Sequence, residues 1–375
     1  MKFLLYISCL LLSLCFIESS FQISFFKELN KNYKNENIIV SPLSVYQILG
    51  LTANGAKGKT LKEIISALGN KNLKEVNKIN ADILKLAKEL RTVEIANAVM
   101  TKFPPKKSFL ATFYRYGATV ETLKSVSQIN AWCNEKTHGK IPKILDSLPP
   151  TTLMILLNVV YFKGKWKEEF DIKDTRWKTF YNCNDKSKEK EVERMTIQKE
   201  FAYYSDKELQ MVELPYKDDS MSAIIILPNR NKDINELISE MNDDRMQSLI
   251  KKMNAENEIA LALPKFELEF ESNLNGVLSE LGMINAFKEL VSDFSGIREE
   301  RNIHIDKIIQ KTYLRVDEEG TKAVAVTGEI MVPDSAPEQK LIIPFIVDRP
   351  FLFMIRNKKM PKNYEMLFMS KIEQL

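Results

Sequence analysis

Residues 317–337 read Asp-Glu-Glu-Gly-Thr-Lys-Ala-Val-Ala-Val-Thr-Gly-Glu-Ile-Met-Val-Pro-Asp-Ser-Ala-Pro. Three acidic residues precede a glycine. Small and β-branched residues follow, and then proline and polar residues that are typical of an exposed turn. Taken alone, the stretch predicts a strand that leads into an exposed turn.

Helical signals dominate the first third of the chain. One helical face is shared by Phe21, Phe25 and Leu29. After a short strand-like run at 38–40, a serine and a proline at positions 41 and 42 fit the N-cap and first residue of a second helix. A third helix is expected to start at Thr60, because residues 60–63 read Thr-Leu-Lys-Glu, the pattern of a capping box.

Strands dominate the rest of the chain. Residues 155–162 predict a strand that is buried on both faces and interrupted by one polar residue, Asn158. Further strands are expected at 209–216, 221–228, 258–270, 341–347, 350–356 and 366–372. Helices followed by strands, without βαβ alternation, indicate the α+β class. The sequence has no repeat or linker, so one large domain is expected.

The N-terminus has the pattern of a secretory signal peptide. Lys2 precedes an apolar run from Phe3 to Ile17, and Ser13 and Cys15 stand at minus three and minus one of a cleavage point. We expect a signal at 1–15, cut between 15 and 19, and a secreted protein. An uncleaved apolar lead-in to the first helix is the alternative.

Composition narrows the classes of partner. A net charge of +4 on 375 residues does not favour nucleic-acid binding. No later segment reaches the ~18 apolar residues of a membrane span, so no membrane partner is expected. Removal of the signal leaves Cys133 and Cys183, which could form one bridge or stay free, and a structural metal site is not expected.

The sequence offers no catalytic centre. Its two histidines, His138 and His304, fit surface or strand positions. Residues 24–27 match the SxxK pattern of a serine nucleophile, but no companion motif follows. The nucleotide, hydrolase and zinc motifs are missing as well. We expect no enzyme, no cofactor and no metal.

At the stretch quoted first, the sequence resembles a known family. Glu318-Glu319-Gly320-Thr321, followed by alternating alanines, looks like the reactive-loop hinge of the serpins. Further stretches resemble the family in order from about 21 to 372: 37–44 (Asn-Ile-Ile-Val-Ser-Pro-Leu-Ser), 55–60 (Gly-Ala-Lys-Gly-Lys-Thr), 158–166 (Asn-Val-Val-Tyr-Phe-Lys-Gly-Lys-Trp), 263–266 (Leu-Pro-Lys-Phe), 293–297 (Asp-Phe-Ser-Gly-Ile) and 349–353 (Arg-Pro-Phe-Leu-Phe).

The resemblance implies a fold and an activity. The fold would have three β-sheets, about nine α-helices and an exposed reactive-centre loop at about 318–344, in a single domain at 16–375. The activity would be suicide inhibition of an endopeptidase, most simply a serine protease. The cleaved loop would enter a sheet as a new strand while the protease stays attached in a covalent 1:1 complex with the monomer. The alternative is a non-inhibitory serpin that acts as a carrier, storage protein or chaperone.

The loop's own residues suit insertion. Side chains of a strand alternate between its faces, and Lys322 must face water. Because of this alternation, the residues on the buried face of the inserted strand would be Thr321, Ala323, Ala325 and Thr327. All four are small enough to fit between packed strands. Glu329 has the same parity, so it needs a basic partner or a partly exposed position.

Family spacing places the cleaved bond fourteen residues beyond Gly320, between Asp334 and Ser335. That position suits a protease with a basic specificity pocket. Cleavage between Met331 and Val332 is the alternative, and it suits chymotrypsin-like or elastase-like enzymes.

The resemblance also assigns supporting residues. Ser41, Ser44 and Asn158 would form a polar network beneath the opening sheet, with Gln310 where a histidine is usual. Glu318 and Lys265 would pair at the top of the loop beside Trp166. The plainer alternatives are a helix cap at Ser41 and two unconnected surface charges. Lysines at 71, 74, 78, 85 and 88 fit a solvated face, so no glycosaminoglycan site is expected.

Overall fold

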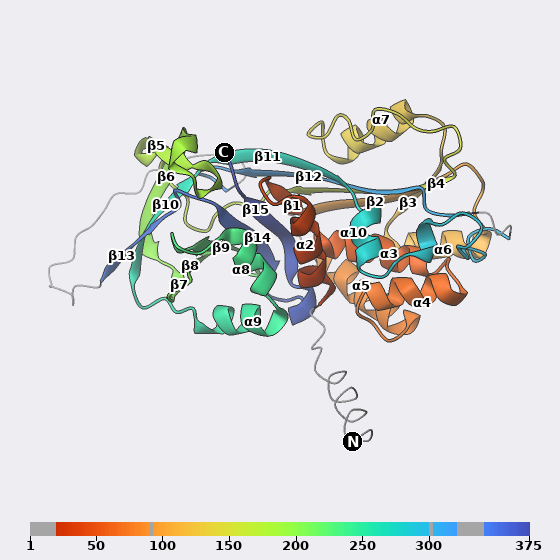
Figure 1. Ribbon diagram of the computed structural model, residues 1–375, viewed down its shortest axis with the longest axis horizontal. Coiled ribbons are helices and arrows are strands. Elements are labelled where there is room, and N and C mark those ends of the chain that lie inside the picture. The colour runs from red at the N-terminus through yellow and green to blue at the C-terminus, as the bar shows by residue number, and fades with distance from the viewer. Residues whose placement is uncertain (1–19, 90–92, 300–302, 321–340) are drawn as a thin grey trace, which may run out of the picture.

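Nine α-helices and three β-sheets make up the part of the chain that the computed structural model describes, namely residues 20–89, 93–299, 303–320 and 341–375. The predicted α+β class, with three sheets and about nine helices, is confirmed for these ranges. The helices within residues 42–116 gather at one end of the molecule, while most of the strands extend toward the other end (Figure 1).

The helices are α2 (Phe21–Asn32), α3 (Pro42–Ala53), α4 (Gly58–Ala67), α5 (Leu73–Glu89), α6 (Lys107–Tyr116), α7 (Val126–Lys136), α8 (Ile234–Glu240), α9 (Asp243–Lys252) and α10 (Asn275–Glu280). The predicted cap of α3 is confirmed. Ser41 is its N-cap, with the Ser41 hydroxyl accepting from the backbone N–H of Ser44 at 3.4 Å, and Pro42 is its first residue. Phe21, Phe25 and Leu29 are all buried on α2.

The prediction for the start of α4 was wrong. This helix begins at Gly58 with Lys57 as an N-cap that makes no side-chain bond. Thr60 and Glu63 instead accept bonds from a distant segment. The Thr60 hydroxyl accepts from the backbone N–H of Asp293, and the Glu63 carboxylate accepts from that of Ile284 at 3.0 Å. The capping-box residues are used for tertiary contacts.

A five-stranded sheet spans the molecule. In order across the sheet, its strands are β11 (Phe266–Asn273), β12 (Lys307–Val316), β4 (Met154–Phe162), β2 (Val93–Thr101) and β3 (Thr119–Thr122). The predicted buried strand is β4, and all nine of its residues are buried. Its neighbours β12 and β4 run parallel, with Gln310 opposite Asn158.

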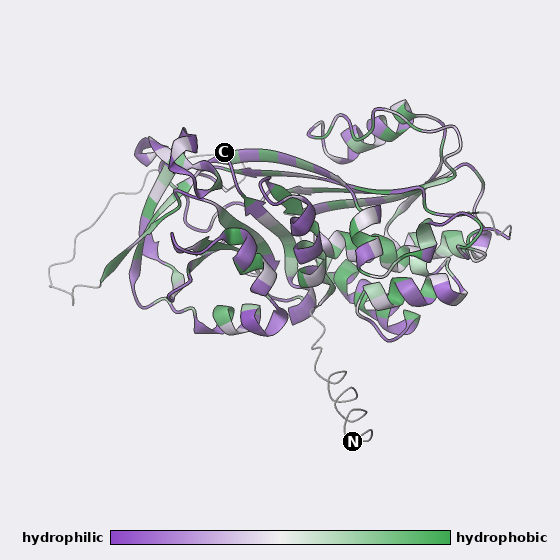
Figure 2. Cartoon of the chain, in the orientation of Figure 1, coloured by the Kyte–Doolittle hydropathy of each residue, from purple (hydrophilic) through white to green (hydrophobic). Residues whose placement is uncertain are grey.

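Both faces of this sheet are covered. Helix α7 lies across one face, where Ile129, Trp132 and Cys133 pack with strand residues in a hydrophobic cluster of their own. On the other face a larger cluster joins α2 and α3 to all three sheets. Figure 2 shows hydrophobic residues concentrated where the helices meet the sheets.

The second sheet has six strands, in the order β1 (Ile38–Val40), β15 (Met366–Ile372), β14 (Phe351–Asn357), β9 (Met221–Pro228), β8 (Leu209–Pro215) and β7 (Ala202–Ser205). The third has four, in the order β13 (Ile342–Ile346), β10 (Glu258–Pro264), β6 (Glu189–Glu200) and β5 (Arg176–Tyr181).

One predicted strand proved to be two. The stretch 258–270 divides into β10 and β11, which belong to the four-stranded and the five-stranded sheet respectively. The break falls after Pro264, a residue that has no backbone N–H to donate and therefore favours the end of a strand. Because Lys265 lies at this junction, it stands next to the C-terminal end of β12.

Candidate functional site

The chain leaves β12 along a short segment, residues 317–320, that is bonded to the residues following β4. The carbonyl of Asp317 accepts from the Trp166 indole N–H at 3.0 Å. The carbonyls of Glu318 and Glu319 accept from the backbone N–H groups of Phe170 and Trp166, at 2.9 and 3.1 Å. The predicted loop therefore starts at a fixed point between the ends of β12 and β4.

Gly320 must be glycine at this point. Its φ is +100°, a conformation that side chains disfavour. A Cβ atom here would lie 2.4 Å from the carbonyl oxygen of Gly164 and 2.5 Å from the backbone nitrogen of Trp166. Since both are backbone atoms, neither can move aside as a side chain could. A glycine is thus required at position 320 by close contact as well as by its backbone angle.

Glu318 is held by charge and hydrogen bonding. Its carboxylate lies 3.2 Å from the Lys265 ammonium and accepts from the Thr175 hydroxyl at 2.7 Å. Burial raises the pKa of this carboxyl, but the bonds from Thr175 and Lys265 outweigh that effect and hold its pKa below the usual value. The structure thus brings Glu318 and Lys265 together as the resemblance implied.

Trp166 is the buried aromatic residue of this site. Its side chain is 1% exposed and stacks on Tyr216, with ring centroids 4.5 Å apart and planes 10° apart. The indole N–H donates to the Asp317 carbonyl, so the ring is fixed by packing and by a hydrogen bond.

Glu319, by contrast, has one carboxylate oxygen without a partner among the described residues. Burial, and to a smaller extent the negative charge of Asp317, raises the pKa of the Glu319 carboxyl.

We predict that Lys265→Met lowers the free energy of unfolding by about 1 kcal/mol at pH 7, the scale of a partly exposed ion pair. Because the pKa of Glu318 is depressed in the folded state, the pair stabilises the protein above the ordinary pKa of glutamate. That contribution is lost as the pH falls through the folded pKa. Urea unfolding at pH 7 and at pH 3 measures both values.

Lys199→Met is the matched control, because Lys199 forms a more exposed pair with Glu168 at 3.5 Å. It should change stability by less than Lys265→Met at pH 7. Equal stability of wild type and Lys265→Met at pH 7, or a difference that persists at pH 3, would show that the pair does not support the loop.

A buried polar network ties β12, β4 and α3 together. The Gln310 amide N–H group donates to the Asn158 carbonyl oxygen at 2.5 Å and to the Ser41 carbonyl at 3.1 Å. The Gln310 carbonyl oxygen accepts from the backbone N–H of Ser41 at 3.1 Å. The Ser44 hydroxyl donates to Asn158 at 2.7 Å. The structure thus brings together all four residues that the resemblance named.

The network includes one residue that sequence reasoning missed. Asn158 donates from its amide nitrogen to the Asn97 carbonyl oxygen on β2 at 2.6 Å. Asn97 stands opposite Asn158 in the antiparallel pair of β2 and β4. An asparagine inside a strand of small apolar residues is the signal that could have identified it, since a buried amide needs a partner.

Ten of the predicted loop residues lie outside the described ranges, so their assignments stay predictions. They are Thr321, Lys322, Ala323, Ala325, Thr327, Glu329, Met331, Val332, Asp334 and Ser335.

The remaining reactive side chains are placed as follows. His138 is exposed and contacts Glu94 at 2.6 Å, and His304 lies 3.5 Å from Asp306. Cys133 and Cys183 do not pair with each other, and burial raises the pKa of the Cys133 thiol to about 12.

Within the described ranges, no group of three or more His, Cys, Asp and Glu side chains could hold a metal ion. No helix in these ranges is long and apolar enough to cross a membrane.

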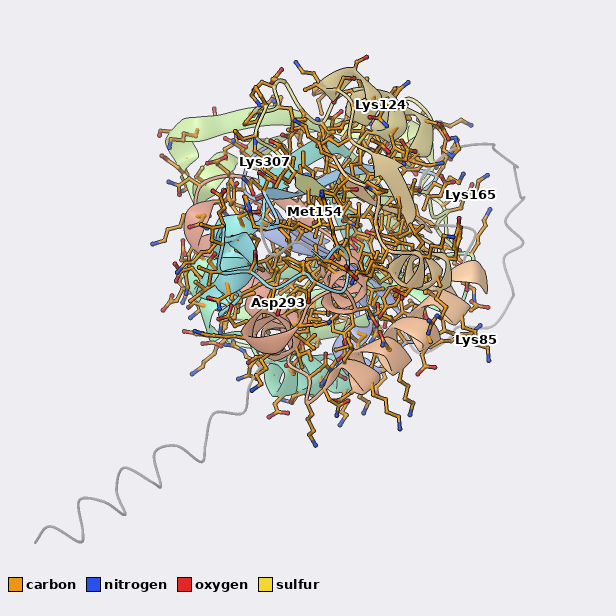
Figure 3. The ribbon with its side chains drawn as sticks, turned by 90° about the vertical axis from the view of Figure 1, so that its right-hand side faces the viewer. Lys85, Lys124, Met154, Lys165, Asp293 and Lys307 are labelled. Atoms are coloured by element: carbon orange, nitrogen blue, oxygen red, sulfur yellow. The ribbon has the colours of Figure 1, made fainter. Side chains whose placement is uncertain are left out.

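Three lysines of α5, namely Lys74, Lys78 and Lys85, are exposed, as is Lys71, which precedes this helix. Lys85 lies at the periphery of the molecule (Figure 3). Their exposure agrees with the predicted solvated face. The absence of a glycosaminoglycan site stays a prediction.

Comparisons with known proteins extend over nearly the whole chain. A sequence model of the family described as Serpin (serine protease inhibitor) matches residues 17–375. Serpin B8 of Homo sapiens is 32% identical over 369 residues, covering 92% of this chain and 96% of that protein. Intracellular coagulation inhibitor 2 of Tachypleus tridentatus is 31% identical over 365 residues, covering 91% and 86%.

A solved structure agrees in the overall fold. The native state of tengpin, a thermophilic serpin, matches with a TM-score of 0.85 and 30% sequence identity, covering 95% of this chain and 92% of that one. The fold and the matched sequences therefore agree on one family.

Proposed function

The chain belongs to the serpin family, and from this membership we propose that it inhibits an endopeptidase as a suicide substrate. A protease cleaves the loop, predicted at about 318–344 and limited by the structure to the residues between Gly320 and β13, and is trapped as an acyl-enzyme when the loop enters the five-stranded sheet. The family's description, serine protease inhibitor, supports a role as an inhibitor and not as an enzyme. We further propose one domain at 16–375 that acts as a monomer.

The position of Gly320 carries this proposal. Gly320 lies against Gly164 and Trp166, which follow β4, and it also follows β12 along the chain. The loop therefore starts between the ends of the two strands that it must separate. Since β12 and β4 are parallel, a strand that turns back from Gly320 runs antiparallel to both neighbours, the arrangement that a short turn allows.

The buried polar network around Gln310 and Asn158 opposes the separation of β12 and β4. An inserted strand has to break the bond between Gln310 and Asn158, because these residues face each other across the strand pair. Both are buried, at 1% and 0% exposure, so their amides must find new partners on the incoming strand. Glutamine does not titrate near neutral pH, so we propose that opening is insensitive to pH at this position.

The target is proposed to be a serine protease that cleaves between Asp334 and Ser335, with the Met331–Val332 bond as the alternative. A panel of proteases with acidic, aromatic and small-residue specificity tests this assignment. Mass spectrometry of the released C-terminal fragment gives the bond, and the mass of the complex gives the 1:1 ratio. Cleavage at neither bond would refute the assigned register, and a panel without any inhibited enzyme would speak against inhibition.

Secretion is a separate proposal that rests on the apolar run at 3–17. The relatives do not support it, because one of them is named an intracellular inhibitor. The sequence contains no Asn-X-Ser/Thr site, so a glycan cannot report passage through the secretory pathway. N-terminal sequencing of protein from the culture medium of eukaryotic cells tests the proposal. Protein that stays in the cells with Met1 intact would refute it.

A further inference from the structure

The outer face of β13 carries a row of exposed apolar side chains. Ile342 is 50% exposed and Ile346 is 45% exposed, and Pro344 between them is exposed as well. Phe345, and Val347 just after the strand, are fully buried. Because successive side chains of a strand point to opposite faces, the three exposed residues line one face of the sheet. We call Ile342, Pro344 and Ile346 the β13 stripe.

The neighbouring strands leave the β13 stripe uncovered. Ala260 and Ala262 of β10 stand opposite its last two residues, and alanine side chains are too short to cover them. Leu341, directly before β13, is 68% exposed and extends the apolar surface. On the far side of β10, β6 places Thr196 and Gln198 opposite these alanines, which gives the surface a polar border. An exposed apolar area with a polar border is typical of a protein–protein contact.

The strand itself is poorly suited to pairing with another strand. β13 forms one edge of the four-stranded sheet and has only five residues. Its middle residue, Pro344, has no backbone N–H to donate. A short edge strand that contains proline disfavours the addition of a strand from a second copy of the chain. An occupant of this surface must therefore use the side chains of the β13 stripe.

The position of the β13 stripe in the chain indicates which partner it meets. Residues 321–340 lie outside the described ranges, and the described chain resumes at Leu341, next to the stripe. Asp334, at the proposed cleaved bond, stands seven residues before Leu341, which is at most about 24 Å of chain. A protein interface covers about 800 Å² on each partner, roughly 30 Å across, so a protease bound at that bond can reach the stripe.

We propose that the β13 stripe is a second contact surface for the target protease, an inference that rests on the proposed function. It packs against an apolar area beside the enzyme's active site before the loop is cut. The stripe belongs to the four-stranded sheet, whereas the cleaved loop enters the five-stranded sheet between β12 and β4. A change in the stripe should therefore affect recognition of the protease and leave loop insertion intact.

Ile346→Glu tests this surface, and Ile342→Glu is the second variant if the first does not fold. A carboxylate in an apolar contact must lose its hydration, so either variant should bind the protease about tenfold more weakly. The Kd is measured with the target protease whose catalytic serine is replaced by alanine, because that complex stays reversible. The second-order rate of inhibition of the active enzyme should fall to the same extent. The number of inhibitor molecules consumed per protease should stay unchanged.

Tyr114→Glu is the matched control. Tyr114 is 85% exposed on α6, which lies at the opposite end of the molecule from β13 (Figure 1), so a carboxylate there should leave the Kd unchanged. Three results would overturn the assignment of the stripe to the protease: an unchanged Kd in both stripe variants, equal weakening by Tyr114→Glu, or a wild-type dimer that Ile346→Glu dissociates. A wild type that inhibits no protease would instead overturn the proposed function, and this inference with it.

Discussion

Thr321→Arg should convert the inhibitor into a substrate that its protease cleaves and releases. Parity places residue 321 on the buried face of the inserted strand, directly after the tightly packed Gly320. Burying a guanidinium between packed strands costs several kcal/mol, enough to stall insertion at its first step. The stalled acyl-enzyme is then hydrolysed. The number of inhibitor molecules consumed per protease, titrated by residual activity, should rise at least tenfold.

Val324→Arg provides the matched control for this substitution. Residue 324 has the opposite parity, so the same side chain would face water in the inserted strand and inhibition should persist. Full inhibition by Thr321→Arg, or equal loss in both variants, would contradict insertion with this parity. Denaturing gels would show the difference as a covalent complex for Val324→Arg and cleaved chains alone for Thr321→Arg.

Cleavage of the loop by a protease that is not trapped should raise the unfolding temperature by about 10 °C. An inserted strand gains hydrogen bonds on both sides, and about six bonds worth ~1 kcal/mol each give roughly this shift for a chain of this size. Calorimetry before and after limited proteolysis measures it. Insertion would also carry an attached protease ~45 Å along the sheet, for about 14 residues at ~3.3 Å each.

The same measurement separates the two classes of serpin. A non-inhibitory carrier, storage protein or chaperone should show no gain in unfolding temperature after cleavage. Cleaved Thr321→Arg is the internal control, since its loop is cut but insertion is blocked. A rise of equal size in this variant would mean that cleavage stabilises the protein without insertion.

Sequence reasoning identified residues of the site better than it identified the contacts that make them necessary. Gly320 followed from the hinge pattern, but the reason for a glycine lies in Gly164 and Trp166, which are far away in the chain. Likewise Gln310, Asn158, Ser41 and Ser44 were named by resemblance. Their mutual bonds depend on the pairing of β12 with β4, which no local pattern reveals.

Strand β12 was missed for a physical reason. It is buried on both sides, by α7 and by the main core, yet it carries Gln310, Lys311 and Thr312 in its middle. Polar residues in succession break the alternation that marks a half-buried strand.

The start of α4 was predicted wrongly because its capping-box residues serve another purpose. Thr60 and Glu63 bond to the segment near 284–293 instead of to their own helix.

The structure of the loop-cleaved protein tests the central claim most directly. We expect β4 and β12 to be separated by a new strand that starts at Thr321 and runs antiparallel to both. The bond between the Gln310 amide and the Asn158 carbonyl oxygen, 2.5 Å in the intact chain, should be broken. A cleaved protein in which β4 and β12 remain paired, with this bond intact, would contradict the proposal that the chain inhibits by loop insertion.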